Sequence, residues 1–373
     1  MILGVDAGRA VGERTGVGRY VLHLLSAWSR SELPFETVRV FSYAPLEGFP
    51  TDPRFRYEVL PGSASELVWQ PLKLRPAAKA VDVLFGHYTL PLGYRGRGVI
   101  NNLGIYEGDL AIPGRQARIR SWHQKWSAQH ADAVIANSVS TKDDLVRFYG
   151  VDPARISVVW PGSAADDYRP AQPGDEEETA AVREREVGSR EAPYFLFVGK
   201  LSARRNVPAL VEAFADVRRA HPEFRLLIVG PNTSGVPVQE LFSRFGVADS
   251  ARYAPFLGSD SLAPLYRAAH AFTLPTEHEG FSGTIPEAIA SGCPVVTVDH
   301  AALADAGLRD AVLHVPSPDP ALLAAAMTRT IEEPGLRERL AAAGLEVSRR
   351  LTWDECARRT MDVIERVARA TRA

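Results

Sequence analysis

The sequence predicts an α/β protein made of two Rossmann-like domains, each with a parallel sheet. Short apolar runs alternate along the chain with longer helical patterns, which is typical of repeated βαβ units. This alternation stops between residues 163 and 191 and restarts at the apolar run Tyr194–Val198. A length of 373 residues also corresponds to about two domains.

The apolar runs and helical patterns assign elements in each half of the chain. In the first half the expected strands are Ile2–Asp6, 37–41, 81–85, 98–101, Ala133–Ala136 and 156–159, and the expected helices are 17–30, 114–129 and 140–149. In the second half the expected strands are Tyr194–Val198, Arg225–Val229, Ala271–Leu274, 294–298 and 312–315, and the expected helices are Val207–Ala220, 261–269, 286–291, Pro320–Glu332, 336–349 and 354–369. We expect Ser140 to cap the helix that Gly150 ends.

Three segments follow from this pattern. We expect an N-terminal domain over residues 1–170, a linker over 171–192 and a C-terminal domain over 193–353. The linker contains the acidic run 175–178 and no apolar strand, so we expect at most one exposed helix there. The final helix, 354–373, is expected to pack back on the N-terminal domain.

Composition and charge exclude several classes of protein. The 43 Lys and Arg against 45 Asp and Glu give a net charge of −2, which argues against a general nucleic-acid binder. Two cysteines, Cys293 and Cys356, cannot make a disulfide framework or a four-ligand zinc site. An acid at Asp6 is too early for a signal peptide, and no apolar run approaches about 18 residues. We therefore expect a soluble cytoplasmic protein.

The densest group of chemically useful residues follows the expected strand Ala271–Leu274. Glu279 and Glu287 lie eight positions apart on a glycine-containing loop and the helix after it, and backbone N–H groups at a helix start favour an anion. A separation of about 10 Å suits two ends of one nucleotide sugar better than the two sides of one glycosidic bond. The alternative is that Glu287 only complements the helix dipole and Glu279 is a surface acid.

A basic loop follows the strand Tyr194–Val198. Lys200 leaves the strand end, and Arg205 precedes Asn206, which is expected to cap the next helix. These cations would neutralise a pyrophosphate and stabilise it as a leaving group. The alternative is a solvated basic loop.

A third signal follows the first strand. Gly16 and Gly18 suggest the G-x-G-x-x-G pattern, but Val21 occupies the third glycine position and the loop after Asp6 is too long for a dinucleotide fingerprint. Glycine still permits close approach to a phosphate, so Gly16 is a candidate contact.

Together these segments resemble the retaining GT-B glycosyltransferases of the family 4 type. The E-x7-E motif matches Glu279 to Glu287, and the opening around Thr15–Tyr20 is similar to the polysaccharide and O-antigen mannosyltransferase-like branch. The resemblance implies that Glu279 binds donor-sugar hydroxyls, Glu287 binds ribose hydroxyls, and Lys200 with Arg205 binds the diphosphate. It also implies a donor-binding role for a further set of residues: Gly16, Gly199, Gly280, Phe281, Ser282, Gly283 and Thr284.

The chain departs from the family pattern at three places. It has Lys200 then Arg205 where relatives have Arg then Lys, and Ser282-Gly283-Thr284 where they have Gly-Leu-Pro. It also has Asn101-Asn102 where many relatives have a His-Asp pair. Asn101 can donate a hydrogen bond but cannot exchange protons, so a usual active-site histidine is missing if this alignment holds.

The resemblance implies transfer of a sugar from a nucleotide-diphosphate sugar to a hydroxyl of a glycan, lipid-linked glycan or natural product, with retention of configuration. No protein nucleophile is evident, so we expect front-face substitution assisted by the departing diphosphate. No D-x-D motif occurs, so we expect neither a metal nor another cofactor. Two alternatives stay open: a non-catalytic nucleotide-sugar-binding protein, and a GT-B-fold sugar-nucleotide epimerase or pseudo-glycosyltransferase.

Two further features concern the acceptor. The segment 115–126, from Arg115 to Trp126, is basic and aromatic, with Ile119, Trp122 and Trp126 on one helical face. It is interpreted either as a peripheral contact with the inner face of the membrane or as a core-packing stripe with a solvated basic back. His87 ends an expected strand and is a candidate acceptor contact or a structural histidine.

Overall fold

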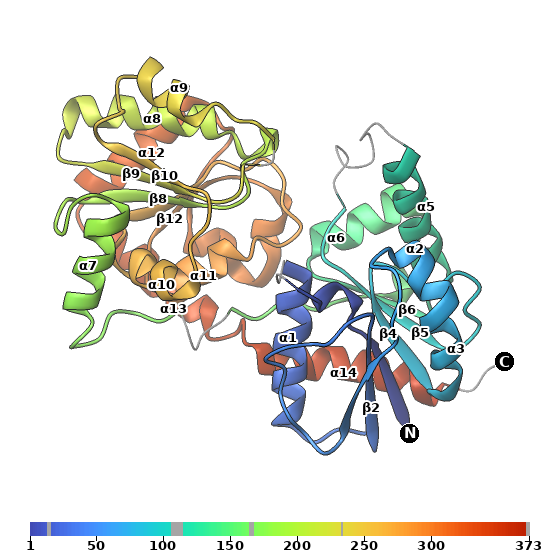
Figure 1. Ribbon diagram of the computed structural model, residues 1–373. Coiled ribbons are helices and arrows are strands. Elements are labelled where there is room, and N and C mark those ends of the chain that lie inside the picture. The colour runs from blue at the N-terminus through green and yellow to red at the C-terminus, as the bar shows by residue number, and fades with distance from the viewer. Residues whose placement is uncertain (13–15, 106–114, 164–167, 233, 371–373) are drawn as a thin grey trace. The chain divides into compact units, whose positions relative to one another are not determined.

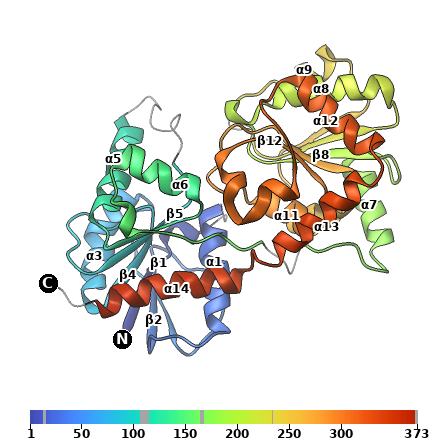
Figure 2. The ribbon, with the colours of Figure 1, turned by 180° about the vertical axis from the view of Figure 1, so that it is seen from behind.

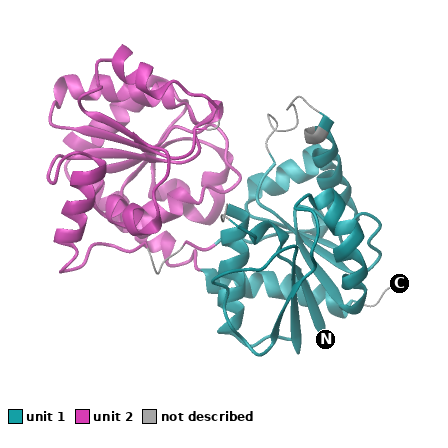
Figure 3. Ribbon diagram, viewed as in Figure 1, with its two compact units in different colours: residues 1–161, 353–373 teal, residues 162–352 magenta. Residues whose placement is uncertain are grey.

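The computed structural model describes residues 1–12, 16–105, 115–163, 168–232 and 234–370, without the side chains of residues 116 and 117. The chain divides into two compact units, which Figure 3 colours separately. Unit 1 comprises Met1–Pro161 and Trp353–Ala373, and unit 2 comprises Gly162–Thr352.

Unit 1 contains a parallel sheet of seven described strands in the order β3-β2-β1-β4-β5-β6-β7. The chain winds outward in one direction from β1 and then in the other from β4, which is the doubly wound Rossmann arrangement. The strands are β1 (Ile2–Asp6), β2 (Thr37–Ser42), β3 (Phe55–Val59), β4 (Val83–His87), β5 (Gly98–Asn102), β6 (Ala133–Ala136) and β7 (Ile156–Val158). The helical elements are η1 (Gly8–Ala10), α1 (Gly16–Ser29), α2 (Glu66–Trp69), η2 (Gln70–Leu74), α3 (Arg75–Ala77), η3 (Ala78–Ala80), α5 (Arg115–His130), α6 (Val139–Asp144), η4 (Leu145–Tyr149), η5 (Pro153–Arg155) and α14 (Trp353–Arg369).

Two apolar cores lie on opposite faces of this sheet. On one face, α1 and α14 cover the strands, and Figure 2 shows α14 running beside α1. Trp28 of α1 is buried there, and its Nε1 donates to the carbonyl oxygen of Ala357 at 3.0 Å. On the other face, residues of α2, η2, α5 and η4 form the second core. The last helix of the chain therefore belongs to unit 1.

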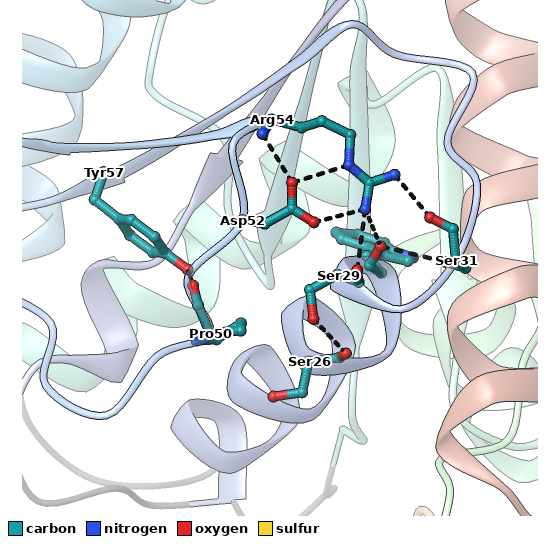
Figure 4. Close-up of polar contacts among 8 residues, drawn as sticks. Ser26, Ser29, Ser31, Pro50, Asp52, Arg54 and Tyr57 are labelled. Carbon is teal, nitrogen blue, oxygen red and sulfur yellow. Dashed lines mark hydrogen bonds and ion pairs between the residues drawn. The ribbon is translucent and has the colours of Figure 1, made fainter.

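The edge strand β3 is absent from the sequence-based expectation, because only its first residue, Phe55, is buried and no apolar alternation marks it. An arginine holds the turn before it in place (Figure 4). Arg54 makes two hydrogen bonds to the Asp52 carboxylate, at 2.9 and 2.6 Å, and donates to the carbonyl oxygens of Trp28, Ser29 and Ser31 at the end of α1. These bonds satisfy carbonyls that a helix end leaves without intrahelical partners.

Unit 2 contains a parallel sheet of six described strands in the order β10-β9-β8-β11-β12-β13, again with a change of direction beside the first strand (Figure 1). The strands are β8 (Tyr194–Val198), β9 (Arg225–Val229), β10 (Ala251–Ala254), β11 (Ala271–Leu274), β12 (Val295–Val298) and β13 (Leu313–Val315). The helical elements are α7 (Glu176–Glu186), η6 (Ala203–Arg205), α8 (Val207–Ala220), α9 (Val238–Arg244), α10 (Ser259–Ala268), α11 (Thr284–Ala290), η7 (Ala301–Ala311), α12 (Pro320–Glu332) and α13 (Leu336–Ser348). The predicted α/β fold class with two parallel sheets is confirmed.

Two local expectations are wrong. The expected linker, 171–192, is part of unit 2: α7 packs against α10, and the acidic Asp175 accepts two hydrogen bonds from Arg169, at 2.7 and 2.9 Å. The helix expected to start at Ser140 starts at Val139, and its cap is Ser138, whose Oγ accepts from the Thr141 N–H at 2.9 Å. Ser138 precedes the helix and has the extended backbone that places its hydroxyl over the first turn, whereas Ser140 lies within the helix. The helix expected to begin at Gly114 is described only from Arg115.

Candidate functional site

Glu279 lies where the strand order of unit 2 changes direction, between β8 and β11, which is the position at which open α/β sheets bind ligands. Its side chain is 3% exposed. Its Oε1 forms ion pairs with Arg204 Nη1 at 2.8 Å and with Arg205 Nη2 at 2.9 Å. The Thr276 hydroxyl also donates to Oε1, at 3.3 Å. One carboxylate oxygen thus joins the loops that follow the two strands.

Arg205 is packed against the end of β8. Gly199 has φ +154°, and a Cβ there would clash with Arg205 Nη1, so a side chain at this position would displace the guanidinium. The Arg205 side chain is 11% exposed, and its Nε and Nη1 are buried without a hydrogen-bond partner in the described part of the chain. Among the described residues, the protein thus supplies a partner for Nη2 of Arg205 but none for its Nε and Nη1.

The structure brings Arg205 and Glu279 together, as the sequence suggested, and adds Arg204, which sequence reasoning did not select. Arg204 Nη1 also donates to the His278 carbonyl oxygen at 2.6 Å. The sequence signal for Arg204 was its position next to Arg205. Only Arg205 was selected, because it precedes the expected helix cap. Lys200 is exposed at the end of β8.

Asn206 occupies the N-cap position of α8, as expected, but its side chain does not cap the helix. Asn206 has left-handed backbone angles, φ 46° and ψ 41°, and its side chain makes no cap hydrogen bond. Its Nδ2 instead donates to the Pro275 carbonyl oxygen at 3.1 Å and to Glu277 Oε2 at 3.0 Å. Asn tolerates this conformation better than most residues, and here it binds the second loop rather than its own helix.

The remaining predicted donor-site residues lie on the loop after β11 and on α11. Glu287 is half-buried on α11, and the Tyr266 hydroxyl donates to its Oε2 at 3.4 Å. The hydroxyls of Ser282 and Thr284 lie 3.0 Å apart. Gly280 and Ser282 are buried, Phe281 is half-buried and Gly283 is exposed. The roles assigned to these residues stay predictions.

A histidine at the neighbouring strand end was also missed. His300 follows β12 and is 7% exposed, and both ring nitrogens are buried without a hydrogen-bond partner among the described residues. Burial lowers its pKa to about 4, an effect that the negative charge of Glu279 partly opposes. The imidazole is therefore neutral near pH 7. A histidine placed just after a predicted strand was the available signal.

Unit 1 places buried polar residues at the same edge of its own sheet. His87 ends β4 and is in register with Asn101 of β5. Both side chains are buried, and none of their polar side-chain atoms has a hydrogen-bond partner in the described ranges. Burial lowers the pKa of His87 to about 3, and its ring packs edge-on against Tyr20 of α1, with centroids 5.9 Å apart. Gly16, exposed, begins the same helix.

A pocket of about 660 Å³ lies at the end of β1, and its lining includes Asp6, Arg9, Glu66 and Arg120. The Asp6 carboxylate accepts hydrogen bonds from the Gly8 N–H at 2.9 Å and from Gln70 Nε2 at 2.8 Å. Burial raises its pKa to about 6. Arg9 donates to Glu66 at 2.6 Å.

The described residues contain neither a membrane-spanning helix nor a cluster of metal-ligand side chains. The described helices include none long and apolar enough to cross a membrane. Over the same described ranges, no three His, Cys, Asp or Glu side chains cluster as metal ligands would. The side chains of Cys293 and Cys356 are both buried.

The aromatic face of α5 is not a core-packing stripe, so that interpretation of segment 115–126 is wrong. Trp122 is 55% exposed, whereas His123 and Ser127 of the same helix are buried. The His123 ring is held by the carbonyl oxygen of Leu90 at 2.8 Å. A buried polar residue thus replaces the apolar one that the helical pattern suggested.

Comparison with known proteins gives a consistent result for both halves of the chain. Residues 14–166 match the model described as "Glycosyltransferase Family 4", and residues 192–333 match "Glycosyl transferases group 1". The D-inositol 3-phosphate glycosyltransferase of Streptomyces griseus is 34% identical over 71% of this chain and 59% of its own length. That of Thermomonospora curvata is 34% identical over 71% of this chain and 63% of its own length. The chain thus spans about three fifths of these relatives.

Solved structures share the fold over nearly the whole chain. Sucrose-phosphate synthase from Thermosynechococcus elongatus has a TM-score of 0.77 at 20% identity, covering 99% of this chain and 100% of that one. Anabaena HepE in complex with UDP-glucose has a TM-score of 0.74 at 15% identity, covering 98% of this chain and 99% of that one.

Proposed function

Because the chain belongs to the GT-B glycosyltransferases of the family 4 type, we propose that it transfers a sugar from a nucleotide-diphosphate sugar to a hydroxyl acceptor, with retention and without a metal. One observation carries the proposal. The buried Glu279 carboxylate is held by Arg204 and Arg205 at the strand-end edge of a Rossmann sheet, beside arginine donors that have no protein partner among the described residues.

The donor roles follow from the chemistry of these groups. Both ion pairs use Glu279 Oε1, which orients the carboxylate and leaves Oε2 to accept a sugar hydroxyl. Arg205 Nε and Nη1, with Lys200, bind diphosphate oxygens, since guanidinium donors suit them. Glu287 binds the ribose hydroxyls. Gly16, Gly199 and residues 280–284 supply close backbone approach to the donor.

In the proposed reaction the bond from the anomeric carbon to the diphosphate oxygen breaks, and a bond from that carbon to the acceptor oxygen forms on the same face. The acceptor proton passes to the departing diphosphate. Arg205 stabilises the negative charge that develops there. Asn101 contributes hydrogen bonds and no proton transfer, since an amide does not titrate.

The acceptor side is proposed in unit 1. Curated relatives are named for D-inositol 3-phosphate, a phosphorylated polyol, and the pocket beside Asp6 offers carboxylates for hydroxyls and Arg9 and Arg120 for an anionic group. We assign a polyhydroxylated acceptor to this pocket, with His87 as a candidate contact.

We also propose a peripheral membrane contact through α5, because Trp122 is exposed beside Arg115 and Arg118 around a shallow pocket. We propose in addition that the protein is cytoplasmic. Sedimentation with phosphatidylglycerol-containing vesicles tests the membrane contact: wild type should co-sediment and Trp122→Ala should not. Equal sedimentation of both proteins, or of neither, contradicts the proposal.

A donor panel tests the transferase. Thermal shifts with UDP-, GDP-, ADP- and dTDP-sugars should single out one nucleotide, since a ligand at 100 times its dissociation constant stabilises by about 2.7 kcal/mol. NMR of the product with that donor should show the donor's anomeric configuration, and EDTA should leave the rate unchanged. An inverted product, or EDTA inhibition reversed by magnesium, contradicts those parts of the proposal. Binding without transfer favours a non-catalytic binder.

A further inference from the structure

We infer that His300 is a specificity-determining residue that hydrogen-bonds a hydroxyl of the sugar carried by the donor. This inference rests on the proposed function and adds to it a residue outside the motifs that carry the family resemblance. It stands on the position of His300, its burial and its lack of protein partners.

The position follows from strand register. β12 pairs in parallel with β11, with Leu274 opposite Thr297, so the loops after both strands leave the sheet at the same edge. Glu279 belongs to the loop after β11, and His300 comes two residues after the end of β12. The negative charge of Glu279 also partly opposes the lowering of the His300 pKa by burial.

Burial makes the missing partners informative. A neutral imidazole carries one N–H donor and one acceptor nitrogen, and leaving either buried and unpaired destabilises the folded protein. His123 and His270 avoid that cost, because each places a ring nitrogen on a backbone carbonyl oxygen, at 2.8 and 3.1 Å, whereas His87 of unit 1 shares it. Neither ring nitrogen of His300 has a partner among the described residues.

The chemistry of the surroundings selects a hydroxyl as the missing partner. The charged and titratable groups that act on His300 are Glu279, His278, Asp299 and Arg309. An ionised phosphate only accepts hydrogen bonds, so it would leave the acceptor nitrogen of a neutral imidazole unpaired. A sugar hydroxyl both donates and accepts, which matches the imidazole. Glu279 and His300 would then bind neighbouring parts of one sugar.

The test separates the sugar from the rest of the donor. Wild type and His300→Phe are titrated by calorimetry with UDP-glucose, UDP-N-acetylglucosamine, GDP-mannose and ADP-glucose, and with UDP, GDP and ADP. For the donor that wild type binds, His300→Phe should weaken the nucleotide sugar about 5- to 10-fold, the value of one or two hydrogen bonds, and should leave the free diphosphate within about twofold. Equal weakening of both ligands, or of neither, overturns the inference.

Conservative variants distinguish a hydrogen bond from packing. Asn reaches the position of one ring nitrogen and Gln that of the other, so His300→Asn or His300→Gln should recover at least part of the lost affinity. Their failure to recover any contradicts a hydrogen-bonding role. Without ligand, His300→Phe should unfold no earlier than wild type, because it removes unpaired polar atoms. If it does not fold, the Asn and Gln variants carry the same comparison of sugar against diphosphate. Wild-type failure to bind any nucleotide or nucleotide sugar contradicts the proposed function instead.

Discussion

Two arginine–carboxylate clusters of this chain differ in how many of their hydrogen-bonding groups the protein itself pairs. In unit 1, each side-chain nitrogen of Arg54 has a partner, supplied by Asp52 and by the carbonyl oxygens at the end of α1 (Figure 4). In unit 2, Arg205 reaches Glu279 through Nη2, while its Nε and Nη1 are buried without a partner in the described residues. The described protein groups thus satisfy every side-chain nitrogen of Arg54 but only one of the three of Arg205.

This difference indicates separate roles for the two clusters. A buried polar group that remains unpaired lowers the stability of the folded protein. Such a group is expected where a bound ligand supplies the missing hydrogen-bond partner. We therefore expect substitutions in the Arg54 cluster to change stability and leave chemistry intact. Substitutions in the Arg205 cluster should lower turnover in the folded protein.

The largest effect should come from the incomplete cluster. Glu279→Ala and Arg205→Ala should each lower turnover with the responding donor at least about 10-fold, corresponding to about 1.4 kcal/mol of transition-state stabilisation. Steady-state kinetics measures this, and Glu240→Ala, an exposed acid on α9, serves as the control. Wild-type turnover in a folded Glu279→Ala or Arg205→Ala enzyme would remove the assignment.

The complete cluster should give a stability effect. Arg54→Ala leaves the Asp52 carboxylate and three carbonyl oxygens without this donor, and should cost about 2–4 kcal/mol, or roughly 5–10 °C in melting temperature. Arg54 lowers the pKa of Asp52, so this stabilisation is present above the unfolded value of 3.8 and is lost as pH falls through the folded value.

Calorimetry at several pH values should therefore show that the difference in melting temperature between wild type and Arg54→Ala becomes smaller below about pH 4. The exposed Arg190–Glu177 pair gives the matched control, and Arg190→Ala should shift the melting temperature by no more than about 1 °C. A melting-temperature difference that does not depend on pH would contradict the purely structural role of Arg54. So would a loss of activity at a temperature where Arg54→Ala is folded.

A third carboxylate gives a smaller effect of opposite sign. Burial raises the pKa of Asp6 from 3.8 to about 6, so its ionised form destabilises the folded chain. This cost is absent below pH 3.8, grows up to about pH 6 and is constant above, with an upper limit of about 3 kcal/mol. Asp6→Asn should therefore raise the melting temperature more at pH 8 than at pH 5. A larger gain at pH 5 would reverse the assignment.

The sequence predicted most of the fold because the central strands are short, buried and apolar. Strands such as β8 and β11 were located to the residue. The strands it missed, β3 and β10, are edge strands with partly exposed side chains and little apolar signal. The segment 171–192 was misassigned because α7 buries only Val182, so its sequence resembles a solvated linker.

Only the site residues that lie in recognisable sequence motifs could be predicted. Glu279 and Arg205 lie in recognisable segments, and strand ends of one sheet bring them together. The roles of Arg204, Asn206 and His300 depend on side-chain direction. The left-handed backbone of Asn206 leaves its side chain without a capping bond, and the register of β11 and β12 brings the loops of Glu279 and His300 to one edge of the sheet. Such directions arise from tertiary packing, which no local pattern in one sequence encodes.

The shared Glu279 oxygen sets a charge balance with a kinetic consequence. Two guanidinium groups converge on one carboxylate, so this group of three carries one positive charge in excess, largely removed from water. On the proposed function, the nucleoside diphosphate left after transfer carries more negative charge than the nucleotide sugar that entered. The same cations should then hold the product more firmly than the substrate, so the spent nucleotide should inhibit the reaction by competing with the next donor molecule for the site.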